Sequence, residues 1–261
     1  MPAGADYWDG VALHWLTARP QRLWRAYSDL LNTRLCEAWL PREPVGRLLK
    51  TDLFDEATSA GLAPLIARHA RQTVGVDVSA RILEAARHAP LARVGADVRR
   101  LPFADASFDC VLSNSTLDHF ATLEELARAL RELARVLRPG GELLLTLDNT
   151  ANPVVALRNA LPSAPLERLG LIPYRMGASC GPARLRGLVL AAGLEPLELG
   201  TTMHCPRALA VALARLLDGA GSVRSRAVFF TCLQAWERLG RWPTRFLTGY
   251  FLTLRARRTI S

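Results

Sequence analysis

The chain has 261 residues, of which 50% are apolar, so it can bury a large core and is not a disordered protein. Its five cysteines are scattered, odd in number and without a close pair, so they suggest neither a disulfide framework nor a zinc knuckle and favour a reducing cytoplasm. The net charge of +9 is diffuse rather than gathered in a basic run, which argues against a nucleic-acid-binding protein. No apolar run approaches the roughly 18 residues of a membrane-spanning helix, and the N-terminus lacks the pattern of a signal peptide.

Aromatic residues dominate the start of the chain, where the first forty residues hold four of the six tryptophans. Large apolar side chains recur at helical spacing from residue 21 to residue 40, and Pro41 and Pro44 end the pattern. This helix either packs on the main domain or forms an aromatic lid over a hydrophobic substrate. We interpret residues 1–45 as an N-terminal helical cap.

From residue 46 to about residue 149, strand-like and helix-like segments alternate. Ser79 is placed to cap one helix, and Thr122 with Glu125 forms a T-x-x-E capping box for another. The predicted strands span 47–54, 72–78, 92–97, 108–114 and 142–149, and the predicted helices span 62–71, 80–89 and 123–137.

This alternation predicts a three-layer α/β, Rossmann-like fold with a mostly parallel sheet. Ligands of such sheets bind beyond the carboxyl ends of the strands. Polar residues follow the predicted strands at those ends: Asp52, Asp77, Asp97, Asn114 and Asp148. The sequence therefore predicts a ligand site at this edge of the sheet.

After residue 149 the pattern is looser and rich in proline. A helix over 182–193 and a strand over 194–202 follow, then two helical stretches at about 207–217 and 225–240, and a last strand over 249–258. We expect residues 46–261 to form one α/β domain with its core at 46–150. Cap insertions are expected at about 150–180 and 205–245, packed on the core rather than on a membrane.

Two blocks of sequence carry a family resemblance. The segments "ADVRRLPFADASFDCVLSNSTLDHF" (96–120) and "RELARVLRPGGELLLTL" (131–147) together resemble the class I S-adenosylmethionine (SAM)-dependent methyltransferases, particularly their small-molecule branch. The resemblance is best over residues 46–149. It implies the same fold, closed by a C-terminal antiparallel strand, and SAM as cofactor.

The resemblance also implies roles for individual residues. Asp77, followed by Val78, ends the second strand, where a carboxylate can accept hydrogen bonds from both ribose hydroxyls. Asp97 is similar to the family residue that accepts from the adenine amino group, and the Val98 amide would meet a ring nitrogen. Their alternatives are a capping aspartate at position 77 and a turn aspartate at position 97.

Two further positions lie where the family's fourth strand ends beside the methyl donor. Asn114 and Ser115 are interpreted as cofactor neighbours, with an ordinary polar loop as the alternative. His119 is a candidate for orienting or deprotonating the acceptor, or is simply packed at the start of a helix. Methyl transfer needs mainly alignment of nucleophile and methyl group, so a dedicated base is optional.

The first loop departs from the family pattern. Its members have an acid and then a glycine-rich turn, whereas this chain has "KTDLFDEA" from Lys50, its only lysine, onward. One hypothesis is that Lys50 pairs with the SAM carboxylate and Asp52 or Asp55 with its ammonium. The alternatives are a pocket for a SAM variant or another nucleoside, and an empty pocket in a scaffold protein. We favour the first.

The sequence thus predicts a cytoplasmic enzyme that methylates a small, hydrophobic or aromatic metabolite. The alternative is a non-catalytic relative that binds a protein partner. No nucleic acid or metal ion is expected, because there is no basic run and the histidines lack ligand spacing. Self-association into a homo-oligomer is left open.

Overall fold

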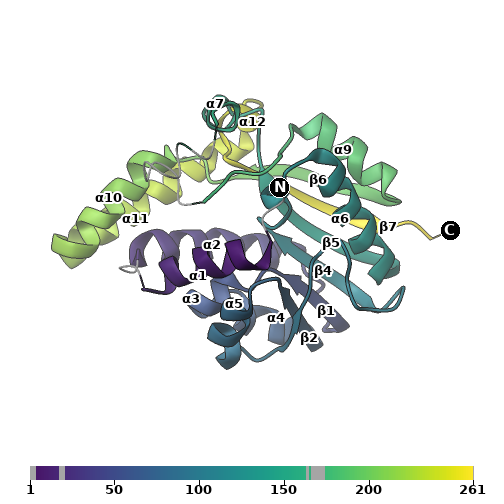
Figure 1. The fold of residues 1–261 in the computed structure, drawn as a ribbon. Helices are drawn as coiled ribbons and strands as arrows, with labels where there is room; N and C mark the ends of the chain where they lie inside the picture. The colour runs from purple at the N-terminus through teal and green to yellow at the C-terminus, as the bar shows by residue number, and fades with distance from the viewer. Residues whose placement is uncertain (1–3, 18–20, 163–164, 166–173, 261) are drawn as a thin grey trace.

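The computed structural model describes residues 4–17, 21–162, 165 and 174–260 (Figure 1). Its centre is a seven-stranded sheet with the order β3-β2-β1-β4-β5-β7-β6, in which β7 runs antiparallel to both of its neighbours. This confirms the predicted Rossmann-like fold with a C-terminal antiparallel strand. The strands are β1 (Val45–Thr51), β2 (Ala70–Asp77), β3 (Ala92–Gly95), β4 (Phe108–Asn114), β5 (Leu137–Asp148), β6 (Leu194–Thr202) and β7 (Phe251–Arg258).

Helices cover both faces of the sheet because neighbouring residues of the buried strands face opposite sides. Leu48 and Leu144 pack with residues of α2 and α4, whereas Leu49 and Leu145 pack with residues of α6 and α9. The Thr122 hydroxyl caps α6 by accepting from the Glu125 amide, as its sequence predicts. The helices of this part are α2 (Arg22–Trp39), α3 (Phe54–Thr58), α4 (Ala63–His69), α5 (Ala80–Ala85), α6 (Leu123–Val136) and α9 (Pro182–Ala191).

The first strand is shorter than its apolar sequence predicts. It ends at Thr51 instead of residue 54, because Asp52 adopts a left-handed backbone with φ 65° and the short helix α3 begins at Phe54. Strand β5 begins earlier than expected, since Leu137 already pairs with Phe108 before a register shift brings Glu142 opposite Cys110. Gly140 and Gly141, which lie between the predicted helix and the predicted strand, are therefore inside β5.

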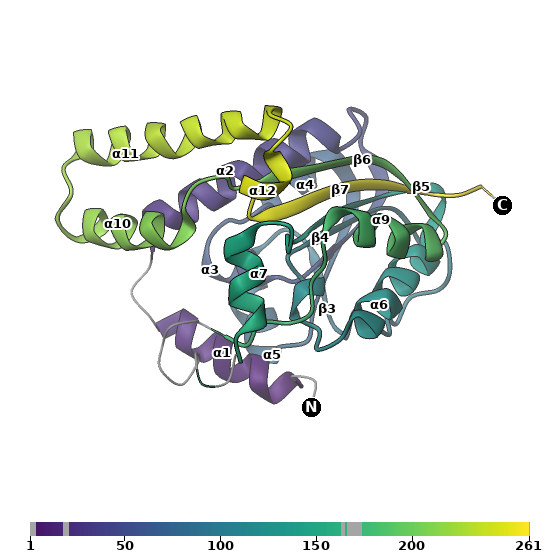
Figure 2. The same ribbon diagram turned by 90° about the horizontal axis from the view of Figure 1, so that it is seen from above.

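The remaining helices lie at the carboxyl edge of the sheet. Figure 2 shows α10 and α11 projecting from the sheet side by side, with α2 beside them and α7 near their base. Tyr27 of α2 and Leu233 of α11 share one buried cluster with Val155 of α7 and Ala210 of α10. These helices are α1 (Ala5–Thr17), α7 (Pro153–Ala160), α10 (Arg207–Ala220), α11 (Val223–Trp236) and α12 (Arg245–Thr248). Within the described ranges, none of the helices combines the length and the apolar composition that crossing a membrane requires.

Candidate cofactor and acceptor site

A cavity of about 2840 Å³ opens at the carboxyl ends of the parallel strands. Its walls come from the loops after β1, β2, β3 and β4 and from α1, α2 and α10. The lining includes nine of the predicted site residues: Asp52, Asp55, Asp77, Val78, Asp97, Val98, Asn114, Ser115 and His119. Lys50 is not among the lining residues, so the structure does not bring its ammonium to the cavity.

The glycine-free loop keeps the backbone shape for which glycine is usually needed. Asp52 has φ 65°, a left-handed conformation that aspartate tolerates better than most residues. Its amide donates to the Val76 carbonyl at 2.9 Å, and its Oδ1 accepts from the Phe54 amide at 2.8 Å. A self-hydrogen-bonded aspartate therefore holds the turn without a glycine.

The space that the loop needs is supplied by the next strand. A Cβ on Gly75 of β2 would lie 2.5 Å from the Leu53 side chain, which is fully buried in the loop. Because Gly75 has no side chain, Leu53 can pack down against the sheet. The loop itself has no glycine, and Gly75 of the neighbouring strand provides the space for its Leu53 side chain.

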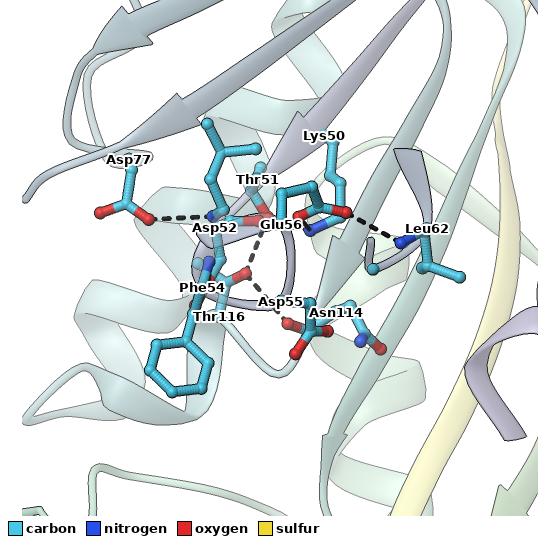
Figure 3. A network of polar contacts seen from close by, with 12 residues as sticks. Lys50, Thr51, Asp52, Phe54, Asp55, Glu56, Leu62, Asp77, Asn114 and Thr116 are labelled. Atoms are coloured by element: carbon cyan, nitrogen blue, oxygen red, sulfur yellow. Dashed lines mark hydrogen bonds and ion pairs between the residues drawn. The ribbon is translucent and has the colours of Figure 1, made fainter. Parts of the chain in front are cut away.

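Lys50 is an internal support of this loop (Figure 3). Its ammonium lies 2.7 Å from Glu56 Oε2 and donates to the Asp52 carbonyl at 2.5 Å. The two side chains are 1% and 0% exposed, and Glu56 Oε1 also accepts from the Leu62 amide at 2.9 Å. Burial lowers the pKa of Lys50, but the carboxylates of Glu56, Asp55 and Asp52 outweigh it and raise that pKa. The predicted contact of Lys50 with SAM stays untested, and the ammonium has a different partner here.

Asp77 connects the loop to the end of β2. Its Oδ2 accepts from the Leu53 amide at 2.9 Å and its Oδ1 from the Ser79 amide at 2.8 Å. Each carboxylate oxygen can accept a second hydrogen bond, so both can still meet vicinal ribose hydroxyls. Burial raises the pKa of Asp77, which the two backbone hydrogen bonds partly offset.

The carboxylate of Asp97 is occupied by Arg99. The Arg99 Nε donates to both oxygens at 3.0 Å, and its Nη2 reaches Asp97 Oδ2 at 2.5 Å. Arg99 also pairs with Glu125 at 2.5 Å and stacks on Phe120, with 4.9 Å from guanidinium carbon to ring centroid. Arg99 must release at least one oxygen before Asp97 can accept from an adenine amino group.

Three hydrogen-bonded polar residues lie at the carboxyl end of β4: Asn114, Ser115 and Thr146. Asn114 Oδ1 accepts from the Thr146 hydroxyl at 2.6 Å, and that hydroxyl oxygen accepts from the Ser115 amide at 2.9 Å. Ser115, like Asp52, is a non-glycine residue with positive φ, at 47°. Such residues concentrate at ligand-binding sites, where the surrounding contacts enforce the less favourable backbone.

His119 lies in an aromatic wall of the cavity. Its ring centroid is 4.7 Å from that of Trp8 and 5.2 Å from that of Tyr174, both in edge-on arrangements. Its Nδ1 is buried and has no hydrogen-bond partner among the described residues. Burial lowers the pKa of His119 to about 4, against the opposing effect of Asp148. The imidazole is therefore neutral at physiological pH and accepts protons only weakly.

Helix α1 covers the cavity along much of its length. Asp9 Oδ1 accepts from the Ser79 hydroxyl at 2.5 Å, next to Asp77. Trp15 packs edge-on against Phe54 of the first loop, with 5.8 Å between ring centroids, while Trp8 contacts His119. The sequence did not predict α1 as a separate helix, and the alternatives of packed helix and lid concern residues 21–40, which form α2. Helix α2 is the packed helix, with Trp39 in the core.

A charged group beyond the end of β5 was missed by sequence reasoning, except for Asp148. Arg158 of α7 pairs with Asp148 and donates to the Tyr250 hydroxyl, and Arg207 of α10 stacks on the Tyr250 ring. Burial and the charge of Asp148 raise the pKa of Asp118 to about 7. These residues come from four distant segments, so no local spacing could have indicated them.

Comparison with known proteins finds similarity to methyltransferases. Residues 57–145 match the family model described as "Methyltransferase domain". The mouse "Probable tRNA methyltransferase 9B" is 40% identical over 73 residues, which cover 28% of this chain and 16% of that protein. A demethylmenaquinone methyltransferase of Corynebacterium kroppenstedtii is 35% identical over 104 residues, covering 40% of this chain and 43% of that protein.

Similarity to solved structures extends over nearly the whole chain. The N-methyltransferase NodS of Bradyrhizobium japonicum, solved in complex with S-adenosyl-L-homocysteine, gives a TM-score of 0.56 at 15% identity over 95% of this chain and 96% of that one. Residues 57–145 therefore resemble a methyltransferase domain, and the chain has a Rossmann-like fold shared with solved methyltransferases. The aligned segments span less than half of the curated relatives, so their substrates are not transferred to it.

Proposed function

We propose that the protein transfers a methyl group from SAM to a small acceptor of hydrophobic or aromatic character. The observation that carries this proposal is the placement of the nucleoside-binding candidates and the aromatic wall around one cavity. SAM is the methyl donor of the class that the domain and fold define.

The cofactor half of the proposed site lies over β1, β2 and β3. Asp77 accepts from the ribose hydroxyls through the lone pairs that Leu53 and Ser79 leave free. Asp97 and the Val98 amide receive the adenine once Arg99 shifts toward Glu125. Asp52 and Asp55 are the carboxylates that line the cavity near the first loop, where the ammonium of the methionine part would lie.

The acceptor half lies between His119, Trp8 and Tyr174. These rings offer flat apolar surfaces to an aromatic or hydrophobic acceptor, and α1 excludes water from one side. Transfer needs the acceptor atom aligned with the methyl group, which positioning alone can accelerate strongly. With a depressed pKa, His119 contributes its ring surface to positioning the acceptor and does not store a proton.

Calorimetric titration of the purified protein with SAM and with S-adenosylhomocysteine tests the proposal. We expect binding that Asp77→Ala weakens by about 1.5–3 kcal/mol, the range for hydrogen bonds to a charged group. Asp105→Ala is the matched control, because that carboxylate lies outside the cavity and is 74% exposed. If a folded protein binds neither ligand, methyl transfer is refuted and the alternative of a partner-binding, non-catalytic relative takes its place.

A further inference from the structure

The acceptor end of the cavity contains an arginine whose guanidinium stacks on aromatic rings and feels the charge of Asp148 without pairing with it. Arg207 lies at the start of α10 and lines the cavity. Its guanidinium carbon is 4.6 Å from the Tyr250 ring centroid and 5.8 Å from that of Phe251. Among the residues that the structure describes, Arg207 makes no ion pair. The two rings hold the guanidinium in place without cancelling its charge.

The neighbouring charges leave this region positive. Arg158 forms an ion pair with Asp148. The positive charge of Arg207 repels that of Arg158 and opposes the increase in the pKa of Arg158. Asp118 is the other nearby carboxyl group, and burial together with Asp148 favours its protonated form. Arg158 and Arg207 thus both lie near one carboxylate, that of Asp148, and only Arg158 pairs with it directly.

The same region joins the aromatic wall. Tyr174 is edge-on to His119, and burial raises its pKa to about 12 against the opposing charge of Arg207. The hydroxyl of Tyr174 is therefore protonated at neutral pH. His119, Tyr174 and Arg207 all line the cavity, so ring surfaces, a neutral imidazole and a guanidinium border one acceptor space.

We infer that Arg207, held by Tyr250 and Phe251 and supported by Arg158, binds an anionic group of the acceptor, so that the substrate is an aromatic or hydrophobic molecule bearing a carboxylate or a phosphate. This inference rests on the proposed function and specifies its substrate class. A guanidinium recognises both oxyanions through paired hydrogen bonds, so the structure assigns the shared chemistry. The anion-binding group is the side chain of Arg207, which lines the cavity and stacks on Tyr250.

Binding of three small probes tests the inference: benzoate, phenyl phosphate and the neutral benzamide, each titrated with tryptophan fluorescence as the signal. We expect benzoate, phenyl phosphate or both to bind more tightly than benzamide. Arg207→Gln should weaken the binding of the preferred anion about tenfold or more and leave benzamide unchanged. The stronger of the two anions identifies the oxyanion as carboxylate or phosphate.

Two further variants keep the result interpretable. Arg224→Gln removes the same charge from an exposed position outside the cavity and should bind the anions like the native protein. Arg207→Lys keeps the charge and should lose less affinity than Arg207→Gln. Equal binding of benzamide and the anions, or equal anion affinity in Arg207→Gln and the native protein, overturns the inference. SAM titration of the same samples reports separately on the proposed function, since SAM affinity does not depend on an anionic acceptor.

Discussion

Replacing Lys50 with methionine should destabilise the fold rather than directly remove a cofactor contact. The side chains of Lys50 and Glu56 are 1% and 0% exposed and their charged atoms are 2.7 Å apart. Removing one partner of such a pair leaves the other charge buried and uncompensated, which costs about 3–5 kcal/mol. The variant also leaves the Asp52 carbonyl without its donor. We therefore expect a loss of about 4 kcal/mol in the free energy of unfolding.

Urea denaturation of a double-mutant cycle measures this quantity. In Lys50→Met/Glu56→Gln the buried charge is gone and the glutamine carbonyl can still accept from the Leu62 amide. We expect this double variant to be destabilised by at least about 2 kcal/mol less than the sum of the single changes. Arg87→Met is the control, because the pair of Arg87 with Glu84 is 53% and 72% exposed and should contribute under about 1 kcal/mol.

The outcome separates two roles for the only lysine. A loss in Lys50→Met no larger than that in Arg87→Met would refute the reasoning that the ion pair supports the loop. If stability were unchanged while SAM affinity fell, the ammonium would contact the cofactor directly, as the sequence first indicated. Glu56→Gln gives a milder test should Lys50→Met fail to fold.

Two other predictions concern the acceptor wall. In Gly177→Ala, the new Cβ would lie 2.3 Å from the Asp118 carbonyl oxygen and 2.5 Å from that of Phe120, so the segment carrying Tyr174 must move away. We expect urea denaturation to show a loss of about 1–3 kcal/mol in the free energy of unfolding. The control is Gly187→Ala, whose new Cβ meets nothing within 4 Å and which should show no loss. The depressed pKa of His119, about 4 against an ordinary 6.5, means that the unfolded chain binds its proton first, so His119 contributes stability above its unfolded pKa that is lost as pH falls toward its folded pKa. Between about pH 7.5 and about pH 5 this loss should be about 2 kcal/mol in the free energy of unfolding, and His119→Gln should lack it. The raised pKa of Asp118 acts in the opposite direction, but Asp118 is present in both proteins. If both proteins lose the same stability over this pH range, the histidine is not buried as a neutral ring.

The sheet could be predicted from sequence because each strand carries its own local signal. The apolar runs ending in Asp77 and Asn114 define both a strand and the position of a polar residue at its carboxyl end. Since parallel strands align those ends, the shared cavity followed from the order of elements alone. The order of strands and helices along the chain was therefore enough to predict at which edge of the sheet the candidate site lies.

The contacts inside the site depend on packing that sequence spacing does not encode. Glu56 follows Lys50 by six residues, and only the left-handed turn at Asp52 and the short helix α3 bring the two side chains together. Arg99 is adjacent to Asp97, yet nothing in the local sequence indicates that it occupies both carboxylate oxygens. The Tyr250 and Arg207 contact joins two elements that the sequence places in separate segments.

Helix α1 makes the two halves of the cavity thermodynamically interdependent. One face of this helix touches Ser79 beside the nucleoside position, Phe54 of the first loop and His119 of the acceptor wall. A ligand that orders α1 from either end spares the other ligand part of that ordering cost, and the effect is reciprocal by linkage. The protein should therefore bind cofactor and acceptor with positive cooperativity, and shortening the chain before residue 18 should weaken both ligands together and abolish that cooperativity.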